Sequence, residues 1–370
     1  MAIVASTLEV GGAERVAASL VERLPDDIET AVCCLRRAGA IGRDMFRAGA
    51  AGMERLEHFR GDPAALIRFV RFLEGYRPHV VYCLDHHNAM FAGRVARLCG
   101  KTGACVVASH ATGLVGRRSS LRWTDRWLLD FTERVVALSP AHARYLCERE
   151  SIDAGRVTII ENGVDTNAFI PATDAIRQLV RAEEGIDATS PVALMVAAMR
   201  PEKAHTVALE AVGSVIECFP GVKVLFAGGG PGRAALEESV RRQGLRNAVH
   251  FLGVRDDVAR LLHAADVLIL PSRDVVETLP LSVMEAMASG LPVIASAVGS
   301  LRDLVIPGRT GWLIAPAHAG ELARAMVECF GDRPRAQRMG AAARAYVEQR
   351  YTVERMVRQY ARLFRDLAVT

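Results

Sequence analysis

The sequence predicts an α/β fold built from two doubly wound domains. Short apolar runs of strand length alternate with amphipathic stretches of helix length along the whole chain, which is the pattern of parallel sheets covered by helices. At 370 residues the chain exceeds the size of one typical hydrophobic core. Hydrophobic residues make up 51% and charged residues 24%, an ordinary globular composition.

The first half of the chain alternates strands and helices. Expected strands cover residues 2–6, 29–34, 80–84, 104–109, 135–139 and 157–160. Residues 11–15 are expected to lead into a helix that ends near Leu24, and further helices are expected over 63–74, up to Cys99 and up to Glu150. Asn162-Gly163 is a turn signal. Residues 166–190 are polar and irregular, and we interpret them as the linker between the domains.

The second half repeats the alternation. Expected strands cover residues 192–198, 222–227, 249–253, 265–272 and 291–295, and the segment 308–314 closes the sheet. Expected helices cover 205–218, 280–289, 318–330 and 335–349. An amphipathic helix at 353–367 is expected to cross back onto the first domain. The domains are therefore predicted at 1–168, joined by a C-terminal helix at 352–370, and at 169–351.

Charge and cysteine usage exclude several classes of protein. A net charge of +4 is small for this length and argues against a nucleic-acid partner. The eight cysteines show no C-x-x-C spacing, so we expect small buried side chains in a reducing compartment, without disulfides or zinc. His86-His87 lack a suitably spaced third ligand, which argues against a metal there. No signal peptide or membrane span is recognisable, and we expect a soluble, cytoplasmic protein.

The most informative stretch runs from Ala264 to Gly311. A buried strand at 265–272 is followed by a loop with Glu277 and by a helix that begins near Pro280 and contains Glu285. In such a unit the ligand site lies beyond the strand end, where the helix N-terminus favours an anion. Two carboxylates beside an anion site fit a ligand that also carries hydroxyl groups. A nucleotide-sugar has this layout, with Glu277 on hexose hydroxyls and Glu285 on the ribose.

A purely structural interpretation of the same residues stays open. Ser282-x-x-Glu285 also fits a capping box, in which Glu285 only satisfies a backbone N–H group. Glu277 would then be a solvated loop charge.

Three motifs resemble those of one enzyme family. Glu277 and Glu285, eight positions apart and followed by Ala-Met-Ala-x-Gly-x-Pro-Val at 286–293, resemble the signature of retaining glycosyltransferases of family 4. Asn-Gly-Val-Asp at 162–165 resembles that family's hinge, and the glycine run at 228–232 resembles its glycine turn. The resemblance extends over essentially the whole chain. It implies a GT-B fold, in which two Rossmann-like domains face each other across a cleft.

The resemblance also implies roles for individual residues. The first domain would hold the acceptor and the second the nucleotide-sugar. The implied catalytic residues are His110, Lys203 and Glu277, and the implied donor-binding residues are Gly11, Gly12, Arg200, Lys203, Val254, Glu277, Leu281, Ser282 and Glu285. Relatives often carry an arginine five residues before the lysine and a glycine after it. Here these positions are Ala198 and Ala204, so that Lys203 is a firmer prediction than Arg200.

The segment at 117–129 places arginines and tryptophans at helical spacing. Arg118, Arg122 and Arg126 would form one face of a helix, and Trp123 and Trp127 an adjacent face. One interpretation is a helix that packs its tryptophans into the domain. The other is contact with a lipid-linked acceptor or with the inner face of a membrane, which would make the protein peripheral there.

These inferences together predict a retaining glycosyltransferase. It would move a sugar from a nucleotide-diphosphate sugar, with UDP favoured over GDP, to a glycan, lipid-linked or small-molecule acceptor. No cofactor is expected, and because the chain has no Asp-x-Asp we expect no metal requirement. A GT-B nucleotide-sugar epimerase and a non-catalytic sugar-nucleotide-binding relative remain as alternatives. A glycoside hydrolase is disfavoured, because both glutamates come from one short segment.

Overall fold

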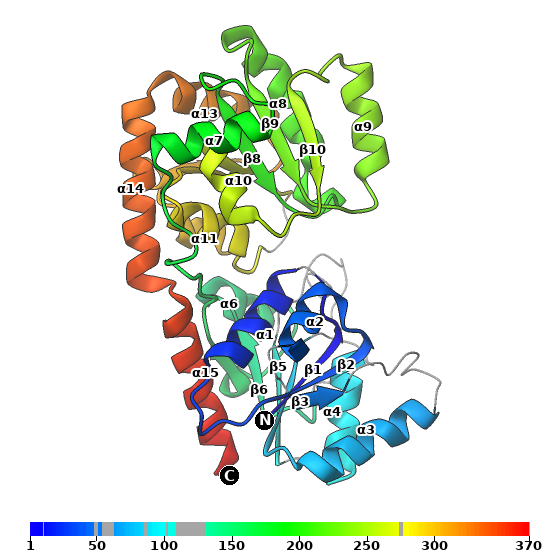
Figure 1. The fold of residues 1–370 in the computed structure, drawn as a ribbon. Coiled ribbons are helices and arrows are strands. Elements are labelled where there is room, and N and C mark those ends of the chain that lie inside the picture. The colour runs from blue at the N-terminus through cyan, green and yellow to red at the C-terminus, as the bar shows by residue number, and fades with distance from the viewer. Residues whose placement is uncertain are drawn as a thin grey trace. The chain divides into compact units, whose positions relative to one another are not determined.

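The chain folds as two compact units of alternating strands and helices (Figure 1). The structure is a computed structural model, and it describes residues 1–9, 11–47, 51–53, 63–84, 88–100, 103–108, 127, 130–273 and 277–369. Unit 1 comprises Met1–Gly163 and Val353–Thr370, and unit 2 comprises Val164–Thr352. The sequence placed these boundaries a few residues away, at 168/169 and 351/352.

The described part of unit 1 contains a seven-stranded parallel sheet in the order β3-β2-β1-β4-β5-β6-β7. Its strands are β1 (Ala2–Thr7), β2 (Ala31–Arg37), β3 (Ala51–Met53), β4 (Val80–Cys83), β5 (Ala104–Ala108), β6 (Arg134–Ala137) and β7 (Val157–Ile159). Its helices include α1 (Gly12–Arg23), α2 (Gly39–Arg47), α3 (Pro63–Tyr76), α4 (Asn88–Leu98), α6 (Pro140–Glu148) and α15 (Val353–Ala368). The sequence patterns located most of these elements, but α2 and β3 were not predicted.

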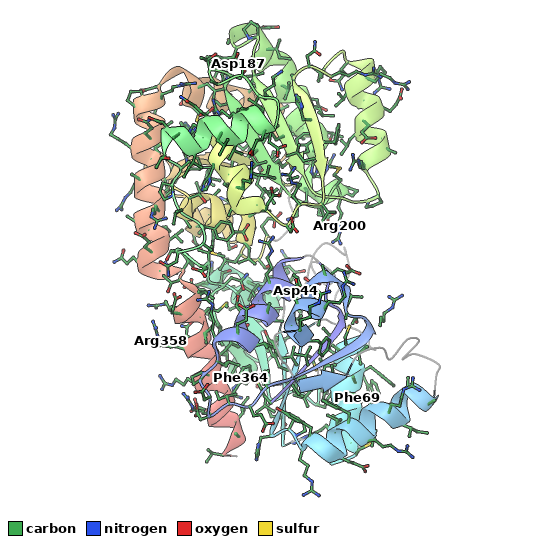
Figure 2. All side chains as sticks on the ribbon, viewed as in Figure 1. Asp44, Phe69, Asp187, Arg200, Arg358 and Phe364 are labelled. Atoms are coloured by element: carbon green, nitrogen blue, oxygen red, sulfur yellow. The ribbon has the colours of Figure 1, made fainter. Side chains whose placement is uncertain are left out.

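Helix α15 returns to unit 1, as its amphipathic pattern predicted. It contacts α1 and β4 and buries its apolar face, including Tyr360 and Phe364. The hydroxyl groups of Tyr82 in β4 and Tyr360 in α15 are hydrogen-bonded at 2.9 Å in the interior. Figure 2 labels Phe364, on the part of α15 that packs against Tyr82. The last helix of the chain is therefore part of the core of the first unit.

The described part of unit 2 contains a six-stranded parallel sheet in the order β10-β9-β8-β11-β12-β13. Its strands are β8 (Val192–Val196), β9 (Lys223–Ala227), β10 (Val249–Gly253), β11 (Val267–Leu270), β12 (Val293–Ser296) and β13 (Gly311–Ile314). Its helical segments are α7 (Asp174–Glu183), η2 (Pro201–Lys203), α8 (His205–Cys218), α9 (Arg233–Arg242), α10 (Val258–Ala264), α11 (Leu281–Ala288), α12 (Leu301–Leu304), α13 (Ala319–Gly331) and α14 (Arg333–Arg350).

This strand order is that of a dinucleotide-binding doubly wound sheet. The chain builds β8, β9 and β10 outward in one direction and then returns to place β11 on the other side of β8. Helix α8 packs against α13, while α7 packs against α10, and Figure 1 shows α7 and α10 in front of β8. In sheets of this kind ligands bind where the direction of building reverses, outside the carboxyl ends of the two central strands. In unit 2 that point lies between β8 and β11.

The linker predicted at 166–190 was wrong, because these residues contain helix α7. The Thr173 hydroxyl caps the helix by accepting a hydrogen bond from the Ile176 N–H group at 3.3 Å. Arg181, which is 2% exposed, donates to the carbonyl groups of Ala264, Ala188 and Ser190 and to the Asp266 carboxylate. The helix is therefore anchored by a buried arginine, and a search for apolar periodicity missed it.

The cysteine prediction was partly right. Cys33, Cys34, Cys83 and Cys329 are buried, but Cys99 and Cys218 are exposed. Among the helices of the described ranges, none combines the length and apolar character needed to cross a membrane.

Candidate active site

The carboxyl ends of β8 and β11 bring Lys203 and Glu277 together. Lys203 ends the short helical turn η2 that follows β8, and Glu277 lies in the loop between β11 and α11. The two strands are direct neighbours, with Leu194 opposite Leu268. Their following loops therefore meet at the same edge of the sheet. The order of the strands reverses between β8 and β11, and we call the carboxyl end of these two strands the ligand edge.

The contact between the two side chains is a two-pronged ion pair. The Lys203 ammonium donates to Glu277 Oε1 at 2.7 Å and to Oε2 at 2.8 Å. The Glu277 side chain is 6% exposed and that of Lys203 is 17% exposed. A pair this far from bulk water is weakly screened, and removing either partner would leave the other charge uncompensated. We interpret it as a functional arrangement because it occupies the ligand edge of the sheet.

The turn that carries Lys203 is hydrogen-bonded to the neighbouring glycine turn. The glycine run after β9 lies directly against the turn after β8, where Met199 N–H donates to Gly229 O at 2.8 Å and Gly232 N–H to Met199 O at 3.0 Å. Gly228 has φ +149°, and a Cβ atom there would lie 2.1 Å from the Ala197 carbonyl oxygen. Only glycine permits this approach. The glycine turn therefore fixes the backbone that carries Lys203.

The backbone directly after Lys203 is strained. Ala204 adopts φ +55° and ψ +43°, the left-handed region, and forms the N-cap of α8. This conformation costs a residue with a Cβ atom about 1 kcal/mol. The family that the sequence resembles often carries a glycine at this position, and the left-handed backbone gives a physical reason for it.

His205, next in the chain, is buried without normal hydrogen bonds. It is 2% exposed and packs edge-on against Phe226 at 5.1 Å between ring centroids. Burial, and secondarily the positive charge of Lys203, lower its pKa to about 4; the Ala197 carbonyl acts in the opposite direction, but neither ring nitrogen has a hydrogen bond of normal geometry. The residue beside the ion pair is thus a neutral imidazole at neutral pH.

Helix α11 begins at the same edge. Pro280 is its N-cap, and Leu281 and Ser282 are its first two residues, whose N–H groups have no acceptor within the helix. Glu285 lies one turn further and is 4% exposed. Because the helix starts at Leu281, Ser282 is not the N-cap, and the capping-box interpretation was wrong. The interpretation of Glu277 as a solvated loop charge was also wrong, since this residue is buried.

The remaining predicted donor-binding residues of unit 2 are exposed. Arg200, labelled in Figure 2, precedes η2, and within the described residues its guanidinium makes no hydrogen bond or ion pair. Val254 is 64% exposed and follows Gly253, whose carbonyl accepts from Gly228 N–H at 2.7 Å. Both residues lie just beyond strands of the sheet. The Arg200 carbonyl accepts from the Lys203 N–H group at 3.1 Å, but within the described residues neither the Arg200 nor the Val254 side chain is bonded to the ion pair.

Of the residues predicted for the site in unit 1, Gly11 and Gly12 lie within the described ranges. Gly11 is the N-cap of α1 and Gly12 is its first residue, beyond the carboxyl end of β1. The β1–β4 pair is the point where the strand order of that sheet reverses. His110, the His86-His87 pair and most of the 117–129 segment lie outside the described residues. Trp127 is described, and the Arg94 guanidinium lies 3.5 Å from its ring centroid.

One contact at the site was missed by the sequence patterns. The Ser272 hydroxyl donates to Glu277 Oε1 at 2.6 Å, and Ser272 is fully buried. Its position directly after β11 was the available signal, because side chains at strand ends face the ligand edge.

Unit 2 is an α/β domain whose strand order reverses between β8 and β11, and comparison with known proteins identifies the family of the chain. The family model described as "Glycosyltransferase Family 4" matches residues 10–168, and the one described as "Glycosyl transferases group 1" matches residues 176–346. The chain belongs to glycosyltransferase family 4.

Solved structures share its GT-B fold. The Anabaena protein HepE, solved in complex with UDP-glucose, superposes with a TM-score of 0.85 at 22% identity, covering 99% of this chain and 100% of that one. Sucrose-phosphate synthase from Thermosynechococcus elongatus superposes with a TM-score of 0.79 at 22% identity, covering 100% and 99%. These similarities establish the fold that the sequence predicted.

Curated relatives include the D-inositol 3-phosphate glycosyltransferase of Corynebacterium aurimucosum. It is 29% identical over 236 residues, which are 62% of this chain and 56% of that protein. The chain thus spans little more than half the length of such relatives.

Proposed function

We propose that the protein is a retaining glycosyltransferase that takes its sugar from a nucleotide-diphosphate sugar. The observation that carries the proposal is the Lys203–Glu277 pair at the point of unit 2 where the strand order reverses. Family membership supports the reaction class. UDP is the favoured carrier, and the HepE complex with UDP-glucose adds to that preference. The acceptor class remains a glycan, a lipid-linked molecule or a small molecule.

The Lys203–Glu277 pair can form further hydrogen bonds, and these suit a nucleotide-sugar. An ammonium group has three N–H donors, and Lys203 directs two of them to Glu277. The third can reach a phosphate oxygen, while the carboxylate can still accept a sugar hydroxyl. The first N–H groups of α11, at Leu281 and Ser282, would add donors for the diphosphate. Glu285 would bind the ribose, and the backbone at Val254 would contact the base.

The proposed reaction needs no protein nucleophile. The bond between the anomeric carbon and the phosphate oxygen breaks, and a bond from the acceptor oxygen to the same face of that carbon forms. The acceptor proton moves to the departing phosphate oxygen. Lys203 would stabilise the charge that develops on the diphosphate, and this removes the need for a bridging metal ion. His110, Gly11 and Gly12 would contribute from unit 1, and their roles stay predictions.

A donor screen tests the proposal. A thermal-shift screen of UDP- and GDP-sugars should identify a stabilising donor, and calorimetry should then give its affinity. Lys203→Ala should weaken that affinity about tenfold or more, the scale of a lost charged hydrogen bond. Lys223→Ala is the matched control, because Lys223 is half-buried, donates to the Asn247 carbonyl and lies at the opposite end of its strand from the ligand edge. Absence of binding by every donor would refute the proposal, and product formed from donor alone would favour the epimerase alternative.

A further inference from the structure

Glu277 is held at both its side chain and its backbone. The Ser272 hydroxyl and the Lys203 ammonium bind the carboxylate. The Ser300 N–H and hydroxyl groups both donate to the Glu277 carbonyl, at 2.9 and 2.8 Å. Gly299 has φ +49°, and a Cβ atom there would lie 2.3 Å from that carbonyl oxygen, so the β12–α12 turn packs directly on the loop. The carboxylate therefore has a defined position.

The two carboxylate oxygens of Glu277 differ in what they can still accept. An ionised carboxylate offers about four acceptor positions, two on each oxygen. Oε1 accepts from Lys203 at 2.7 Å and from Ser272 at 2.6 Å, which fills it. Oε2 accepts from Lys203 at 2.8 Å, and within the described residues it has no second donor. Counting donors from the described residues alone, one acceptor position is left, and it lies on Oε2.

The Ser272 contact is strong enough to enforce this difference. Its 2.6 Å length is that of a charge-assisted O–H···O⁻ bond, a class roughly twice as strong as neutral hydrogen bonds. Ser272 follows β11 and Pro271 and is fully buried, so its hydroxyl is placed by the end of the strand and shielded from competing water. Without this bond the carboxylate could rotate about its last side-chain torsion, which is a soft one.

We propose that Ser272 is a positioning residue that turns Glu277 Oε2 toward a hydroxyl of the donor sugar. The proposal rests on the proposed function, because it assigns that hydroxyl to a nucleotide-sugar. Ser272 itself does not contact the ligand; it acts by occupying Oε1. The bond would therefore serve recognition of the sugar and leave recognition of the nucleotide unchanged.

Calorimetry with UDP and UDP-glucose on the full chain tests this assignment. The measured quantity is the affinity advantage of UDP-glucose over UDP. Ser272→Ala should reduce that advantage about fivefold or more, since a hydrogen bond to a charged group contributes at least that much, while the affinity for UDP should stay at the wild-type value. Ser272→Thr keeps a hydroxyl group and should recover at least part of the advantage.

The matched control is Ser296→Ala. Ser296, at the end of β12, is also fully buried, but its hydroxyl has no hydrogen-bond partner within the described residues. This variant should leave both affinities unchanged. Equal weakening of UDP and UDP-glucose by Ser272→Ala, or an unaltered advantage in that variant, would overturn the assignment and leave the proposed function intact. A wild-type protein that binds neither compound would instead count against the proposed function, and the assignment would fall with it.

Discussion

Lys203 and Glu277 are 74 residues apart in the sequence, yet their side chains form an ion pair through both carboxylate oxygens. They meet because β8 and β11 are neighbours in the sheet although two strands are built between them in the chain. The same crossover creates the ligand edge of a doubly wound sheet. The pair and the ligand edge therefore have one topological cause, and this links the fold to the proposed chemistry.

Truncating either member of the pair should reduce turnover strongly. We expect Lys203→Ala and Glu277→Ala each to lower the turnover number about 10²-fold or more, the scale of losing one preorganised electrostatic contact. Lys223→Ala should retain wild-type turnover. Steady-state kinetics with the donor identified by screening provides the measurement. Near-normal turnover in both truncated variants would refute the site assignment.

Relaxing the strain after Lys203 should stabilise the protein. Ala204→Gly removes the Cβ atom from a residue at φ +55°. The gain of about 1 kcal/mol in the folded state is partly offset by the extra chain entropy of glycine, and we expect a net increase of about 0.5 kcal/mol in the free energy of unfolding. Denaturant titration measures it. Ala208→Gly serves as the control, because Ala208 lies within helix α8 and glycine there should lower the free energy of unfolding by about 1 kcal/mol. A loss of stability in Ala204→Gly would contradict the strain argument.

His205 should make the protein sensitive to acid. Its pKa is about 4 in the folded protein and about 6.5 in an unfolded chain, so the unfolded state binds more protons between these values. Stability from this group is complete above pH 6.5 and is lost as the pH falls toward 4. From pH 7 to 4.5 the loss should be about 2 kcal/mol.

Denaturant titrations of wild-type protein and His205→Leu at several pH values isolate this contribution. The leucine variant keeps an apolar side chain against Phe226 but cannot titrate. It should show a shallower decline of stability with acid. Parallel declines in the two proteins would show that His205 is not the responsible group.

The tyrosine pair that anchors α15 should behave non-additively. Tyr82 and Tyr360 share one buried hydrogen bond, and burial raises the pKa of both hydroxyl groups. Tyr82→Phe or Tyr360→Phe alone leaves a buried hydroxyl without its partner and should cost about 1–3 kcal/mol. The double variant removes both groups and should cost less than the sum. A double-mutant cycle by denaturant titration checks this, and strict additivity would argue against the contact.

The elements that the sequence predicted well are those with a clear repeat of apolar side chains. Helix α8 was placed at its observed bounds, His205–Cys218, and β11 and α11 were placed within a few residues. Motifs identified Lys203 and Glu277 as candidate site residues. Their direct contact could be seen only once the structure showed that β8 and β11 are neighbours. Sequence spacing carries no information about which strands become neighbours across a crossover.

Two of the misses, helix α7 and Ser272, involve buried polar side chains. Helix α7 is held by Arg181, whose buried guanidinium bonds to three carbonyl groups and to Asp266, so its polar sequence resembled a linker. Ser272 was overlooked for a related reason, since a lone serine after a strand carries no pattern of its own. Arg181 bonds to Ala264 and Asp266, 83 and 85 residues further along the chain, whereas Ser272 bonds to Glu277 across the loop that follows β11. Neither side chain belongs to an apolar repeat, and only the folded backbone shows what it contacts.

A crystal structure of the protein with a bound nucleotide-sugar tests the central claim most directly, with UDP-glucose as the first compound to soak. We predict the diphosphate beside the Lys203 ammonium and the N-terminus of α11, with a sugar hydroxyl donating to Glu277 Oε2. Density for the donor away from the edge between β8 and β11, or a sugar that makes no contact with Glu277, would contradict the account.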